Sequence, residues 1–161
     1  MSLRIILTSF VFAILLSACS NDLNLTSDWK DIPVVYGLLN ESDANHYIRV
    51  EKAFLDPETS AFLLALEPDS IFYNNVTVFL ENVNSGQQFQ LQRVDGNDEG
   101  FEKEEGVFAS SPNYLYKIDS TSLDLRGGEE MKLIVNRGDN LPQVTATTIV
   151  LDDMVLAVKG V

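Results

Sequence analysis

The sequence predicts a mainly β fold, an antiparallel β-sandwich of immunoglobulin-like type with one short helix. Three observations carry this prediction. Short runs rich in β-branched and aromatic residues recur along the chain, several of them alternate apolar with polar residues, and turn-forming residues separate them at short intervals. Strands of an antiparallel sheet with one buried face have this pattern.

Seven segments are expected to be strands. Residues 32–39 (IPVVYGLL) form a compact apolar run, and residues 46–55 follow after a polar turn, so the two are expected to pair as a β-hairpin. Residues 75–81 (NVTVFLE) and 87–94 (QQFQLQRV) alternate and predict a second hairpin. The remaining expected strands are residues 114–119, 131–136 and 143–151.

One helix is expected between the two hairpins. Asp56-Pro57-Glu58 is typical of a helix start, residues 61–66 (AFLLAL) would form the helix, and Pro68 disfavours its continuation. The apolar run has no polar stripe, so its periodicity does not select a buried face. Either the helix caps the open end of the sheet, or Phe62, Leu63 and Leu66 face outward and dock another protein. We expect the cap, because large exposed apolar patches are uncommon on soluble monomers.

The N-terminus carries a targeting signal. Arg4 precedes the apolar run of residues 5–16, which is shorter than the roughly 20 apolar residues that a membrane-spanning helix needs. Leu16-Ser17-Ala18-Cys19 resembles the lipobox of bacterial lipoproteins. The resemblance implies a signal peptide of residues 1–18 and acylation of Cys19.

This resemblance also divides the chain. Residues 19–31 would be the lipidated cysteine and a polar tether, and residues 32–161 the β-sandwich domain. Ser20 stands where an aspartate would, in some bacteria, retain the protein at the inner membrane, so attachment to the outer membrane is expected. The periplasmic and surface faces of that membrane stay open as alternatives.

Charge and cysteine content exclude several classes of function. Lys and Arg total 11 against 24 acidic residues, a net charge of −13, and such a surface repels nucleic acid. Cys19 is the single cysteine, so its acylation would leave no thiol for a disulfide, a zinc site or a nucleophile. His46 is the sole histidine, no G-x-S-x-G motif accompanies it, and we expect it at the surface beside a strand. No catalytic residues are predicted.

One loop resembles the first half of a calcium site. In Asp95-Gly96-Asn97-Asp98-Glu99-Gly100, oxygen-bearing residues alternate, and Asp95, Asn97 and Glu99 would be the ligands. Two departures weaken the match: Glu99 stands where Asp or Asn is usual, and Gly106 occupies the place of the closing glutamate. Calcium is therefore a hypothesis on which the function does not depend.

Two longer runs resemble a known group of proteins. PVVYGLLNESDANHYIRVEKAFL and PDSIFYNNVTVFLE are similar to the start of Bacteroidetes-type outer-membrane lipoproteins that carry a β-rich domain of unknown function. The resemblance implies membrane attachment and a sandwich-like domain, and it implies no activity. Members of that group are often longer, so this chain is either a short version or part of a longer one.

These patterns predict a lipid-anchored cell-envelope protein whose domain is non-enzymatic and serves binding or assembly. The partners would be the membrane, through the lipid, and an envelope protein, through residues 61–66. The alternative is a carbohydrate-binding module, because β-sandwiches commonly present aromatic side chains to sugars. The aromatic residues available for that role are Trp29, Tyr47, Tyr73, Tyr114 and Tyr116.

Overall fold

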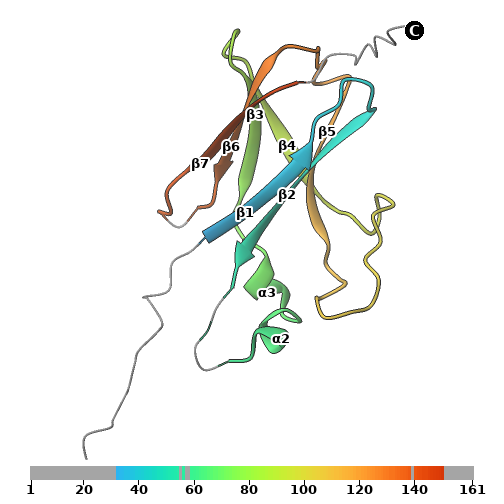
Figure 1. The fold of residues 1–161 in the computed structure, drawn as a ribbon, viewed down its shortest axis with the longest axis vertical. Coiled ribbons are helices and arrows are strands. Elements are labelled where there is room, and N and C mark those ends of the chain that lie inside the picture. Colours follow the sequence, from blue (N-terminus) through green and yellow to red (C-terminus); the bar gives the residue numbers. More distant parts are fainter. Residues whose placement is uncertain (1–31, 55, 57–58, 139, 151–161) are drawn as a thin grey trace, which may run out of the picture.

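The computed structural model describes residues 32–54, 56, 59–138 and 140–150. Seven strands form one antiparallel sheet in the order β1-β2-β5-β4-β3-β6-β7 (Figure 1). The predicted mainly β class is confirmed. The strands are β1 (Ile32–Leu38), β2 (Asn45–Ala53), β3 (Thr77–Asn82), β4 (Gln88–Asp95), β5 (Tyr114–Asp119), β6 (Glu130–Asn136) and β7 (Val144–Ile149). The signal peptide, Cys19 and the tether lie outside the described residues.

All seven expected strands are present, with ends shifted by at most two residues. Both predicted hairpins are confirmed. β1 pairs with β2, with Val34 opposite Glu51, and β3 pairs with β4, with Leu80 opposite Phe89. Period-two alternation identified β2, β3 and β4, whereas β1 was predicted from its apolar run.

β4 changes partner along its length. Its first half, Gln88–Leu91, pairs with β3, and its second half, Gln92–Asp95, pairs with β5. The sheet therefore folds along β4, and β1 and β7 remain as its two edges. The main core lies between the two parts of the folded sheet. It joins Ile48, Val50, Tyr116 and Ile118 of β2 and β5 to Val78, Leu80, Met131 and Val135 of β3 and β6.

The predicted single helix is instead two short helices, α2 (Ala61–Leu64) and α3 (Pro68–Ile71). The N-cap of α2 is Ser60 and not Asp56, whose carboxylate accepts a hydrogen bond from the Thr59 hydroxyl at 2.8 Å. Pro68 begins α3, because a proline suits the first turn of a helix, where its missing N–H costs nothing.

The expectation that Phe62, Leu63 and Leu66 cap the core is wrong. All three side chains are exposed, and Ala65 is the buried residue beside them. The end of the sheet is covered instead by Ile71 and Phe72, which form a second core cluster with Ala109. No residue of α2 itself is buried, and Ala65, its C-cap, is the one that turns inward.

Candidate functional site

The acidic loop after β4 is held by its own side chains. Asp95 Oδ1 accepts the backbone N–H of Asn97 at 3.0 Å and that of Asn113 at 3.2 Å. Asn97 Oδ1 accepts the N–H of Lys103 at 3.2 Å, and Asn97 Nδ2 donates to the carbonyl of Ser110 at 3.0 Å. Two of the three predicted calcium ligands thus lie in one turn, and their oxygens bind backbone groups.

Glu99, the third predicted ligand, contacts two neighbouring strands, β2 and β5. Its Oε2 accepts hydrogen bonds from Lys117 Nζ at 2.6 Å and from the Tyr47 hydroxyl at 2.9 Å. These two donors, Lys117 first, hold the pKa of the Glu99 carboxyl below its usual value. Calcium would have to displace these contacts in order to bind. Over the described residues, no group of three His, Cys, Asp or Glu side chains is placed to hold a metal ion.

Asn113 organises this loop, and the sequence analysis did not identify it. The side chain is fully buried. Its Oδ1 accepts from Arg49 Nη1 at 2.7 Å, and its Nδ2 donates to the carbonyl of Phe101 at 2.7 Å. Gly96 lies so close that an added Cβ would stand 2.8 Å from Asn113 Nδ2. Asn113 therefore ties β2 and both ends of the loop together.

His46 is not at the surface, which corrects the expectation. The side chain is only 1% exposed, and neither ring nitrogen has a hydrogen-bond partner among the described residues. Burial lowers its pKa, although the charge of Asp43 acts in the opposite direction. His46 alternates in phase with the buried Ile48 and Val50 on β2, and this phase places it inside.

The first candidate binding surface is formed by Phe62, Leu63 and Leu66, and we call it the α2 surface. Their exposed fractions are 69%, 60% and 51%. The loop that carries exposed Val107 and Phe108 joins this region, because the N–H of Ala109 donates to the carbonyl of Ala65 at 2.8 Å. Such a concentration of exposed large apolar side chains is typical of an interaction site.

The first hairpin shows where the α2 surface lies relative to the start of β1. Ile32, where the described chain begins, pairs with Ala53, the last residue of β2 before the helices. Figure 1 shows α2 and α3 at the same end of the molecule as the start of β1. The chain segment that arrives from the N-terminus therefore joins the domain at its α2 end.

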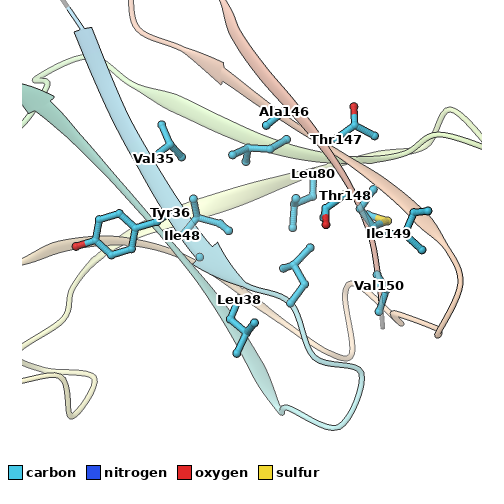
Figure 2. Close-up of a pocket in the computed structure, with 14 residues that line it drawn as sticks. Val35, Tyr36, Leu38, Ile48, Leu80, Ala146, Thr147, Thr148, Ile149 and Val150 are labelled. Carbon is cyan, nitrogen blue, oxygen red and sulfur yellow. The ribbon is translucent and has the colours of Figure 1, made fainter. Parts of the chain in front are cut away.

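The second candidate is an apolar groove between the two edge strands (Figure 2). Residues 35–39 line one side, residues 146–150 line the other, and the volume is about 400 Å³. This volume lies within the range of small-molecule pockets. The floor consists of Ile48, Leu80, Met131 and Leu133. No local sequence pattern indicates such a groove, because its two sides are more than 100 residues apart and only the folding along β4 brings them together.

Two of the four tyrosines considered for a sugar platform are buried, and the other two pack against neighbouring rings. Tyr73 and Tyr116 are buried. The ring of Tyr47 packs edge-on against Phe101 at 4.8 Å between centroids, and the ring of Tyr114 packs against Phe72 at 5.3 Å. The Arg93 guanidinium lies 4.5 Å from the centroid of the Tyr114 ring. Tyr47 and Tyr114 keep part of their surface exposed, and Trp29 lies outside the described residues.

In the part of the chain that the structure describes, no helix is both long and apolar enough to span a bilayer.

Comparison of the chain with protein-family models, with curated proteins and with solved structures found no match of any of the three kinds.

Proposed function

We propose that this chain is a lipid-anchored protein of the bacterial outer membrane whose domain binds another envelope protein without catalysis. The observation that carries the proposal is the exposure of Phe62 and Leu63 on α2, and of Leu66 just after it, because a helix of one turn is not stable by itself. Burying a leucine or phenylalanine side chain on a partner contributes about 1.5–3 kcal/mol. Three such side chains therefore form a substantial anchor for a partner.

The attachment point supports a partner at the membrane. A tether of residues 19–31 would reach at most about 45 Å when fully extended. Because the chain joins the domain at its α2 end, acylation of Cys19 would hold the α2 surface on the side nearer the bilayer. The proposed partner is therefore a protein of the same membrane. A single acyl chain binds weakly, so lasting attachment requires more than one.

The proposal includes the finer architecture, an immunoglobulin-like sandwich. The sharing of β4 between β3 and β5, together with core residues contributed by both parts of the sheet, supports two packed layers that meet along β4. The absence of catalysis is also part of the proposal. It is supported by the burial of His46, the sole histidine, which puts its ring nitrogens out of reach of a substrate.

The test is a pull-down from solubilised membranes with the acylated protein and its Leu63→Asp variant. We expect specific membrane proteins to be recovered with the unchanged chain and lost with Leu63→Asp, because a charge in the contact would be desolvated. Val83→Asp is the matched control, since Val83 is exposed at the far end of β3. Equal recovery with both variants, each shown to be folded by circular dichroism, would contradict the proposal.

A further inference from the structure

The two edges of the sheet run in the same direction. Every neighbouring pair among the seven strands is antiparallel, so directions alternate along the order β1-β2-β5-β4-β3-β6-β7 and the first and last strands agree. Figure 1 shows β1 and β7 pointing the same way. The two edges therefore cannot complete an antiparallel sheet with each other. One further strand, running opposite to both, can.

The two edge strands also expose large apolar side chains. On β1, Ile32, Val34, Tyr36 and Leu38 are each between 42% and 74% exposed, and Tyr36 and Leu38 line the groove. Ile149 of β7 is 64% exposed. Long apolar edges are hazardous because their unpaired N–H and C=O groups can pair with other chains, and natural proteins protect them. Neither edge carries a charged residue, and Pro33 protects β1 only near its start.

We propose that residues 154–158 of this chain (MVLAV) form an eighth strand in the groove between β1 and β7. Their sequence position supports this occupant. β7 ends at Ile149, and Val150 is buried beside the groove, where its N–H donates to the carbonyl of Glu129 and its carbonyl accepts from the N–H of Gly128. The chain therefore leaves the described structure at the end of the groove itself.

Length and composition support the same occupant. Asp152-Asp153 provides the polar residues of a tight turn, and a two-residue connection suffices between antiparallel strands. Five residues in a strand span about 17 Å, one residue less than the six of β7. An apolar segment suits a groove whose floor is Ile48, Leu80, Met131 and Leu133. The inference is independent of the α2 surface and its partner.

The experiment is hydrogen–deuterium exchange with mass spectrometry on the full acylated chain in lipid nanodiscs, compared with a chain that ends after Asp153. We expect peptides that cover residues 32–39 to exchange about tenfold faster in the shortened chain, because the free-edge amides of β1 lose their hydrogen bonds. Equal exchange of residues 32–39 in the two chains would overturn the proposal.

If the shortened chain does not fold, point variants of the full chain test the same proposal. Val155→Asp and Leu156→Asp place a charge on opposite faces of the proposed strand, so one of them must face the groove floor. That variant is expected to open β1 while the amides of β2 and β5 stay protected. Val161→Asp, outside the strand, is the control and is expected to change nothing. Unchanged protection in both strand variants would overturn the proposal.

A second copy of the chain is the competing donor of the strand. Protection of β1 that is the same in nanodiscs holding one chain and in those holding two supports the proposal. Protection that requires two chains would overturn it in favour of strand exchange. The pull-down with Leu63→Asp reports on the proposed function separately, because Leu63 lies on α2 and does not line the groove.

Discussion

His46 combines two features that rarely occur together, full burial and two ring nitrogens without a hydrogen-bond partner among the described residues. A buried imidazole without partners favours its neutral form, because the charged form would lose its hydration. The lowered pKa of His46 is the consequence. The side chain thus fills space in the core, and it makes stability sensitive to acid.

The sign of that sensitivity follows from linkage. Between the lowered pKa in the folded state and the ordinary value of 6.5, the unfolded chain binds a proton at His46 and the folded chain does not. The free energy of unfolding is therefore expected to fall as the pH drops below about 6.5, by up to about 1.4 kcal/mol per pH unit from this residue.

His46→Leu is expected to remove this contribution. Urea unfolding of both proteins at pH 7 and pH 5.5 measures it. At pH 7 the variant should be as stable as the unchanged chain or more so, because replacing an unpartnered polar group by an apolar one is nearly neutral or stabilising. At pH 5.5 it should lose less stability than the unchanged chain. The same loss in both proteins would show that His46 does not carry the effect.

Some single residues can be placed from the sequence and others cannot. The burial of His46 could be predicted, because it alternates in phase with Ile48 and Val50 along a strand that was correctly predicted. The role of Asn113 could not be predicted. Its partners Arg49 and Phe101 lie 64 and 12 residues away, and only the assembled sheet brings them together.

At the scale of elements, strands were predictable and helices were not. Each strand carries its own evidence, since alternation records which face is buried. The segment 61–66 is apolar on all sides, so no pattern indicated that α2 would stop after Leu64 and turn Phe62 and Leu63 outward. That outcome depends on Ile71 and Phe72, which lie later in the chain and occupy the place that the helix would have filled.

The loop between β4 and β5 depends on one side chain. Asn113→Ala would remove the hydrogen bonds to Arg49 Nη1, which would keep only Glu51 Oε1 at 3.2 Å, and to the carbonyl of Phe101. The loss of buried hydrogen bonds of this kind costs about 1–3 kcal/mol. We expect the free energy of unfolding, measured in urea, to fall by about 2 kcal/mol. We also expect faster proteolysis between β4 and β5.

Asn84→Ala is the matched control, because Asn84 is an exposed asparagine in the turn between β3 and β4. Its stability is expected to stay within about 0.5 kcal/mol of the unchanged chain, as is usual for surface substitutions. If Asn113→Ala is no less stable than Asn84→Ala, the hydrogen bonds of Asn113 do not hold the loop.

In the molecule as a whole, the two candidate binding surfaces lie in two different places. The α2 surface lies at the end where the chain joins the domain, and the apolar groove opens between the two edges of the sheet. Local sequence patterns predicted the seven strands and the two hairpins, but not the partner change of β4 or the approach of β1 to β7. Those features are set by contacts between distant segments, which a single sequence does not record.

The proposed membrane attachment through Cys19 would place the α2 surface near the bilayer, and it can be tested on the whole protein. In a Gram-negative host, the unchanged chain is expected in the membrane fraction, with an N-terminal peptide that begins at Cys19 and carries acyl mass. Cys19→Ser removes the only thiol and should leave the chain either uncleaved at residue 18 or unacylated. Ser20→Ala is the control and should behave as the unchanged chain.

The physical reason is that each buried methylene of an acyl chain contributes about 0.8 kcal/mol, whereas the acidic domain gains nothing from anionic lipid. A cleaved Cys19→Ser chain is therefore expected in the soluble fraction. If it stays membrane-bound as before, or if the mature unchanged protein has a free thiol at Cys19, attachment does not depend on lipid. The α2 surface would then be a candidate for membrane contact in its own right, since Phe62, Leu63 and Leu66 are exposed at the end of the domain where β1 begins.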